Sequence, residues 1–280
     1  MNPTPLIGAA QLQQAMAGDE PLVVIDTGFD LADTAAGERQ WREAHIRGAF
    51  YLHLDRDLSA AKTGSNGRHP LPDRPTFAAT IGALGITPAT QVIVYDRQQG
   101  MVAARAWWML RWLGHAAVAV LDGGLAAWQA AGGALDSAPP VARPAPPYPL
   151  REPLVGTVDA AALASSLGRV TLVDARAGER FRGEVEPLDA QAGHIPGALN
   201  RFFKDNLAAD GRFKAPELLR AEFERLGVAP GERVVHQCGS GVTACHNLLA
   251  MDVAGWGPTA LYPGSWSEWS SDPARPVARG

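Results

Sequence analysis

Cysteine is scarce in this chain, which has only Cys238 and Cys245 among its 280 residues. Two cysteines seven positions apart do not encode a framework of structural disulfides, and a zinc site would need more ligands. Each cysteine is therefore to be interpreted as a lone thiol, either reactive or buried as a small apolar side chain.

Long apolar runs and basic clusters are also missing. No window approaches about 18 uninterrupted apolar residues, and the N-terminal segment lacks the basic start and apolar core of a secretory signal. The net charge is -4, and no basic patch with interleaved aromatic residues occurs, which argues against a nucleic-acid surface. We therefore expect a cytoplasmic protein that binds neither nucleic acid nor a membrane.

The sequence contains an internal duplication with a period far longer than that of a solenoid repeat. Three segments recur in order: Val24-Ile25-Asp26 as Leu172-Val173-Asp174, His45-Ile46-Arg47-Gly48-Ala49 as His194-Ile195-Pro196-Gly197-Ala198, and Leu84-Gly85-Ile86 as Leu226-Gly227-Val228. The stretch between the copies is rich in proline and is expected to be an extended connector. The predicted organisation is a domain over 1–134, a linker over 135–153 and a second domain over 154–280.

Each copy alternates short β-branched runs with helical patterns. Pro21 to Ile25, Gln91 to Tyr95 and Ala117 to Leu121 are expected to form strands, and Met101 to Leu113 a helix. This alternation predicts an α/β fold with a parallel sheet covered by helices.

The stretch around Cys238 is the most informative for function. An apolar run, Val234 to Gln237, stops at Cys238; Gly239, Ser240 and Gly241 follow, and a helical pattern starts near Val242. Backbone N–H groups in a glycine-rich turn before a helix favour an anion, so a thiol at this point is expected to react as the thiolate. Burial as a packing residue is the alternative for Cys238.

The segment Cys238 to Ala244, CGSGVTA, resembles the active-site loop of the two-domain rhodanese superfamily, and in particular that of 3-mercaptopyruvate sulfurtransferases. Thiosulfate sulfurtransferases usually carry basic residues in this loop, and this chain has none there. The resemblance implies tandem rhodanese-like domains, each with a mainly parallel five-stranded sheet flanked by helices. Asp96 takes the position of Cys238 in the first copy, which is therefore expected to be degenerate.

The resemblance also implies roles for further residues. Asp55 precedes a polar loop in the first copy, and His69 lies within that loop. Both match residues that family members lend to the active site; a solvated surface loop is the alternative. Ser240 is expected to join them in a proton relay, or to cap the following helix. The loop N–H groups from Gly239 to Thr243, including Gly241 and Val242, are expected to stabilise the sulfur anion.

Arginines after the first strand of the second copy are the candidate anion ligands. The resemblance assigns the substrate anion to Arg180, whereas Arg176 and Arg182 are expected to pair with acids such as Asp174 or Glu184. The sequence departs from the family in one respect. Animal 3-mercaptopyruvate sulfurtransferases have a second arginine after a Glu-Pro-Glu-Pro segment, but here Glu184-Val185-Glu186-Pro187 is followed by Leu188 and Asp189.

Two other residues near the loop are expected to be packing residues. Cys245 lies on the flank of the predicted helix, and His236 lies on the strand two positions before Cys238. Trp266, in a C-terminal segment similar to the family's, is expected either to line the site or to pack against the sheet.

These observations predict a sulfurtransferase that works by a ping-pong route without a metal or organic cofactor. Cys238 takes a sulfur atom from 3-mercaptopyruvate as a persulfide and passes it to cyanide, a small thiol or a thioredoxin-like protein. The alternatives are a thiosulfate:cyanide sulfurtransferase and a non-catalytic rhodanese-like module that carries sulfur or binds a partner. A cysteine phosphatase is disfavoured because Ala244 stands where its loop has arginine.

Overall fold

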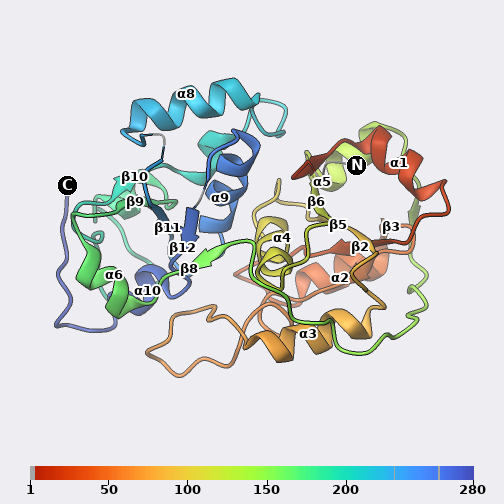
Figure 1. Ribbon diagram of the computed structural model, residues 1–280, viewed down its shortest axis with the longest axis horizontal. Helices are drawn as coiled ribbons and strands as arrows, with labels where there is room; N and C mark the ends of the chain where they lie inside the picture. The colour runs from red at the N-terminus through yellow and green to blue at the C-terminus, as the bar shows by residue number, and fades with distance from the viewer. Residues whose placement is uncertain (1–3, 230, 258) are drawn as a thin grey trace. The chain divides into compact units, whose positions relative to one another are not determined.

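A computed structural model describes residues 4–229, 231–257 and 259–280 and contains two compact units (Figure 1). The first unit holds the chain up to Ala60 together with Pro72–Leu154 and Asp210–Arg212. The second holds Ala61–Leu71, Val155–Ala209 and Phe213–Gly280. Two short segments thus cluster with the half of the chain to which they do not belong in sequence.

The first unit alternates strands and helices as the sequence patterns predict. Its elements are β1 (Leu6–Ile7), α1 (Ala9–Met16), β2 (Leu22–Asp26), α2 (Ala36–Glu43), β3 (His45–Ile46), β4 (Phe50–Tyr51), α3 (Arg74–Ala83), β5 (Gln91–Tyr95), α4 (Ala103–Trp112), β6 (Val118–Leu121), α5 (Gly124–Ala130) and β7 (Leu135–Asp136). The predicted strand Gln91 to Tyr95 is confirmed.

The helix predicted over Met101 to Leu113 is observed as α4 (Ala103–Trp112), which is shorter at both ends. The preceding residues instead wrap around the Asp96 carboxylate, which accepts hydrogen bonds from the N–H groups of Gly100, Val102 and Ala103.

The second unit repeats this alternation. Its elements are β8 (Gly156–Thr157), α6 (Ala160–Ser166), β9 (Thr171–Asp174), α7 (Gly178–Phe181), β10 (Leu199–Asn200), the 3₁₀ helix η1 (Phe203–Asn206), α8 (Pro216–Leu226), β11 (Val234–Gln237), α9 (Ala244–Val253), β12 (Thr259–Leu261) and α10 (Ser265–Trp269). Familiar helix signals set the limits of α8, which begins with Pro216 and ends before Gly227 at a φ of 103°.

The two five-stranded sheets have the same topology. The strand order is β1-β6-β5-β2-β4 in the first unit and β8-β12-β11-β9-β10 in the second, and all these pairs are parallel. β5 and β11 are the central strands, and Asp96 and Cys238 follow their carboxyl ends. The α/β class with two parallel five-stranded sheets is confirmed.

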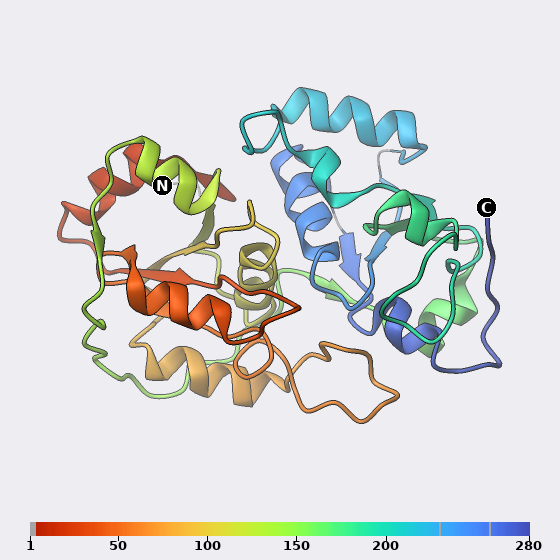
Figure 2. The same cartoon turned by 180° about the vertical axis from the view of Figure 1, so that it is seen from behind.

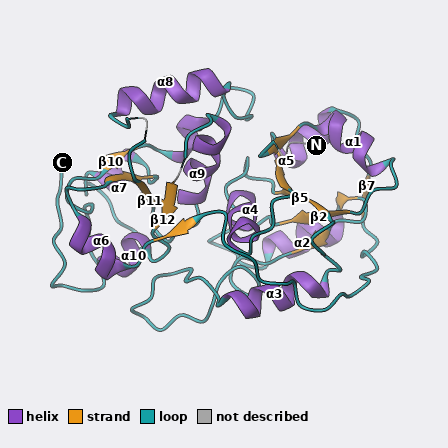
Figure 3. Ribbon diagram, in the orientation of Figure 1, coloured by secondary structure: helices purple, strands orange, loops and turns teal. Residues whose placement is uncertain are grey.

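Both faces of the second sheet are buried, which explains why its strands are apolar throughout. Alternate residues point to opposite faces: Leu172 and Val235 pack with α6 and α10, and Val173 and Val234 pack with α8 and α9. Figure 3 shows α8 and α9 on one side of these strands and α6 and α10 on the other. Among the described helices, none combines the length and the hydropathy needed to cross a membrane.

Candidate functional site

Cys238 lies where the central strand β11 meets the loop before α9, and the residue is 2% exposed. The Sγ atom accepts hydrogen bonds from the N–H groups of Ser240 at 3.4 Å and Gly241 at 3.1 Å. Such donors stabilise negative charge on the sulfur. In the described chain, the other N–H groups predicted for this cradle, those of Gly239, Val242 and Thr243, make no hydrogen bond to Sγ.

The first residues of α10 hold the backbone of this loop by hydrogen bonds. The Cys238 N–H donates to Ser265 Oγ at 3.1 Å, and the Cys238 and Gly239 carbonyls accept from the N–H groups of Trp266 at 3.0 Å and Ser267 at 2.9 Å. These bonds fix the backbone on both sides of the sulfur, so the thiol is presented by a rigid turn.

His69 lies beside this loop because the segment Ala61–Leu71 belongs to the second unit. Figure 2 shows this segment next to α10, and the N–H of Arg68 donates to Ser267 Oγ at 3.0 Å. His69 Nδ1 and Ser240 Oγ are 2.7 Å apart, and both side chains are buried. The alternative of a solvated loop is therefore wrong for His69.

Ser240 does not cap the helix, so that alternative is wrong as well. α9 begins at Ala244, two residues later than the pattern near Val242 indicated, and Thr243 is its N-cap, without a side-chain hydrogen bond. The Ser240 hydroxyl points to His69 instead.

Two guanidinium groups converge on the loop beside the sulfur. A Cβ atom on Gly239 would lie 2.7 Å from Arg68 Nη2, 3.5 Å from Arg180 Nη1 and 3.6 Å from Arg180 Nη2. Arg68 Nη2 and Arg180 Nη1 donate no hydrogen bond to any other described residue, so both are available to an anion above Gly239. The missing side chain of this glycine leaves the space that the two groups need.

Arg68 is a site residue that sequence analysis missed. Burial lowers the pKa of its guanidinium and the charge of Arg180 lowers it further, while the charges of Cys238 and Glu186 raise it. Its position next to His69 was the available signal, since a loop that brings His69 to the sulfur also brings its neighbour.

Carboxylates orient the arginines. Arg180 pairs with Glu186 at 2.6 Å through Nη2 and Oε1, and the same Nη2 is 3.1 Å from Asp189 Oδ2. The other oxygen of Asp189 pairs with Arg68 Nη1. Arg68 and Arg180 therefore share one carboxylate.

The predicted ion pairs of the other two arginines are confirmed. Arg176 pairs with Asp174 at 2.7 Å in a buried contact, and its guanidinium lies over the Trp266 ring at 4.8 Å. Arg182 pairs with Glu184 at the surface. Trp266 is fully buried with the α6 and α10 core, in line with its packing role.

The remaining predicted residues lie as follows. Cys245 is buried and its Sγ contacts the Gly241 carbonyl at 3.3 Å, which confirms packing. His236 is buried, with Nε2 2.9 Å from Met251 Sδ, and burial lowers its pKa to about 3. Asp55 belongs to the first unit, where its N–H donates to His53 Nδ1 at 3.1 Å.

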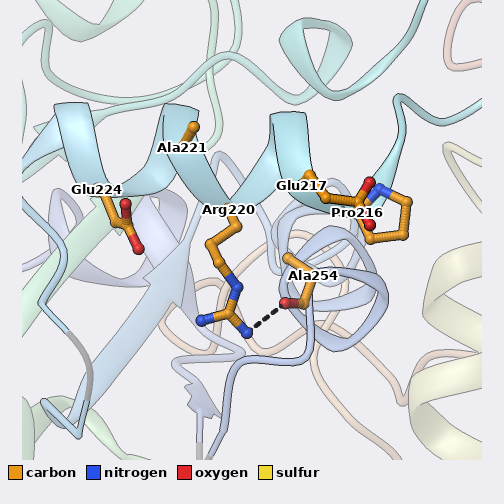
Figure 4. Close-up of a pocket in the computed structure, with 6 residues that line it drawn as sticks. All are labelled: Pro216, Glu217, Arg220, Ala221, Glu224 and Ala254. Atoms are coloured by element: carbon orange, nitrogen blue, oxygen red, sulfur yellow. Dashed lines mark hydrogen bonds between the residues drawn. The ribbon is translucent and has the colours of Figure 1, made fainter.

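A hollow of about 320 Å³ elsewhere in the second unit is not part of this site (Figure 4). It is lined by Pro216, Glu217, Arg220, Ala221, Glu224 and Ala254. Arg220 donates to the Ala254 carbonyl at 2.8 Å and thereby satisfies the C-terminal end of α9, whereas Cys238 precedes the other end of that helix. Arg220, which lines this hollow, is therefore a structural residue.

The equivalent loop of the first unit holds its own anion. Asp96 is fully buried, and its carboxylate accepts four backbone N–H groups, from Gln98, Gly100, Val102 and Ala103, at 2.8 to 3.0 Å. The carboxylate occupies the cradle that receives a sulfur in the second unit. This loop therefore presents no nucleophile.

Comparison with known proteins agrees with this architecture. The model of the rhodanese-like domain matches residues 8–131 and 157–272. A probable 3-mercaptopyruvate sulfurtransferase of Pseudomonas aeruginosa is 48% identical over 285 residues and covers 100% of both chains. A putative thiosulfate sulfurtransferase of Mycobacterium tuberculosis is 41% identical over 98% of this chain and 97% of its own.

A solved structure gives the same result. The 3-mercaptopyruvate sulfurtransferase from Leishmania major superposes with a TM-score of 0.84 at 31% identity, over 95% of this chain and 74% of its own. With two matched domains and full-length relatives, the chain belongs to the two-domain rhodanese superfamily of sulfurtransferase enzymes.

Proposed function

We propose that this sulfurtransferase takes a sulfur atom from 3-mercaptopyruvate onto Cys238 and passes the resulting persulfide sulfur to a thiol or cyanide acceptor. The observation that carries the proposal is the placement of the Cys238 sulfur, which accepts two backbone N–H groups beside the convergent guanidinium groups of Arg68 and Arg180. Sulfur and anion sites of this kind suit a small donor that carries a carboxylate.

In the first half-reaction the Cys238 thiolate attacks the donor sulfur. A sulfur–sulfur bond forms, the carbon–sulfur bond of the donor breaks, and the electron pair moves to the enolate of pyruvate. The proton that leaves the donor thiol returns to the enolate carbon. In the second half-reaction the acceptor attacks the outer sulfur, and Cys238 leaves as the thiolate.

The relay for this proton is His69 with Ser240. The 2.7 Å separation of His69 Nδ1 and Ser240 Oγ supports a proton path beside the sulfur, and a positioned acid–base pair suits this step. Family resemblance adds Asp55 to the relay, and this role remains a prediction.

Thiosulfate is the second candidate donor. The Mycobacterium tuberculosis relative bears a thiosulfate sulfurtransferase name, and the anion position beside Gly239 has two guanidinium groups for a dianion. In favour of mercaptopyruvate, the loop itself carries no cation, and the relay offers a proton path that thiosulfate does not need, since sulfite leaves as an anion.

The test is the intact mass of the reduced protein after brief treatment with mercaptopyruvate or, separately, with thiosulfate. We expect the gain of one sulfur atom from mercaptopyruvate, and none in Cys238→Ser. Cys245→Ser is the matched control, because it removes the other thiol and should still gain the sulfur.

A gain mainly from thiosulfate would move the assignment to that donor. A gain from neither donor, with the fold intact by circular dichroism, would contradict both assignments and favour a binding or carrier module.

A further inference from the structure

We propose that Asp189 selects the donor by its charge: its carboxylate lies between Arg68 and Arg180 as an internal counter-anion and disfavours dianionic donors relative to monoanionic ones. This inference rests on the proposed function, and it adds a specificity determinant that the loop sequence does not contain.

The position of Asp189 carries the argument. Its side chain is 2% exposed, one oxygen pairs with Arg68 Nη1, and the other is 3.1 Å from Arg180 Nη2. The same two guanidinium groups also face Gly239 beside the sulfur, Arg68 through Nη2 and Arg180 through Nη1 and Nη2. A donor anion above Gly239 and the Asp189 carboxylate therefore share the same two cations.

Charge in this cluster is balanced before a donor arrives. Three cations, Arg68, Arg176 and Arg180, meet three carboxylates, Asp174, Glu186 and Asp189. The Cys238 thiolate makes the sum negative, and each charge on the donor adds to the repulsion. Both negative charges of a dianion such as thiosulfate are repelled by the cluster, whereas a monocarboxylate has only one charge to be repelled.

Arg180 has a second carboxylate partner besides Asp189. Glu186 holds Arg180 through two contacts, Nη2 to Oε1 at 2.6 Å and Nε to Oε2 at 3.3 Å. The backbone of Arg68 is held by Ser267 Oγ, and its guanidinium donates through Nη1 to Asp189 Oδ1, an acceptor that asparagine keeps as its amide oxygen. Neutralising Asp189 should therefore change the charge of the site more than its geometry, and asparagine keeps the shape of the side chain.

The experiment compares kcat and KM for mercaptopyruvate and thiosulfate in the wild type and in Asp189→Asn. Removing one nearby negative charge should lower KM about threefold for the monocarboxylate and about tenfold for the dianion, at nearly constant kcat. The preference for mercaptopyruvate then falls about threefold, and it falls less at high ionic strength because salt screens the charge.

Two further variants separate charge from structure. Asp189→Glu restores the charge and should return the ratio to the wild-type value. Glu184→Gln removes one carboxylate from the same segment, at a surface pair with Arg182, and should leave the ratio unchanged.

The proposal is overturned if Asp189→Asn leaves the donor ratio unchanged, if it weakens both donors equally, or if Glu184→Gln shifts the ratio as much. These outcomes differ from a failure of the proposed function. In that case the wild type itself takes no sulfur onto Cys238 from either donor.

Discussion

At the scale of single residues, the contrast between Asp96 and Cys238 distinguishes the two units: the second unit has a thiol where the first has a carboxylate. The two residues follow equivalent central strands, and both accept backbone N–H groups from the loop that follows. A carboxylate fills such a cradle and satisfies its donors permanently. A thiolate uses the same donors while it remains a nucleophile.

His69→Gln provides a prediction at this scale. Loss of the proton relay with Ser240 should lower kcat/KM for mercaptopyruvate by about 10² to 10³, because that donor must release a proton and form a protonated product. Thiosulfate should be affected by less than about threefold, since its leaving group departs as an anion. Steady-state assays with both donors on one preparation check the prediction.

The thiosulfate assay is the internal control for folding of the His69→Gln variant. Equal loss with both donors would contradict the relay and would assign His69 a role in holding the loop.

At the scale of elements, the loop between β11 and α9 owes its shape to its contact with the segment before α10. Gly241 has a φ of 77°, and a Cβ there would lie 2.4 Å from the Pro263 carbonyl oxygen. Only glycine satisfies both the backbone conformation and the close approach. The Gly241 N–H that donates to Sγ is therefore placed by the fit of two chain segments.

Gly241→Ala should therefore damage both the fold and the site. We expect a loss of roughly 1 to 3 kcal/mol of unfolding free energy, from strain and from displacement of Pro263, and slower formation of the persulfide. Urea unfolding and time-resolved mass measurements check the two effects.

Gly168→Ala is the matched control for the loop variant. Gly168 has a similar φ of 74°, but a Cβ added there would meet nothing within 4 Å, so this variant reports the backbone strain alone. If the two variants behave alike in both measurements, the contact with Pro263 is unimportant.

At the scale of the whole molecule, His236 links stability to pH. Burial lowers its pKa to about 3 in the folded state, whereas the unfolded value is near 6.5. Between these values the unfolded chain binds one more proton, so stability falls as the pH is lowered, by about 1.4 kcal/mol per pH unit. Asp26, whose pKa is raised by burial, acts in the opposite direction near its own titration.

The comparison of the wild type with His236→Leu isolates this effect. The difference in unfolding free energy between the two proteins, measured by urea titration from pH 7 to pH 4, should shift in favour of the variant as the pH falls. A pH-independent difference would show that His236 does not remain neutral in the folded protein.

The repeated architecture and the position of Cys238 at the end of a strand could be predicted from the sequence, because both depend on local patterns. β5 and β11 have the bounds expected from their apolar runs, and the duplicated motifs indicated two copies of one domain, which the two sheets of the same topology confirm. Cys238 was found because a glycine-rich turn between a strand and a helix is a short-range signal.

Only the tertiary structure decided the surroundings of the sulfur. His69 and Ser240 are 171 positions apart, and Arg68 and Asp189 are 121 apart. Such pairs have no local pattern, since packing of distant segments brings them together. The sequence determined the fold and the place of the Cys238 thiol, whereas the two guanidinium groups, their shared carboxylate and the contact between His69 and Ser240 depend on long-range packing.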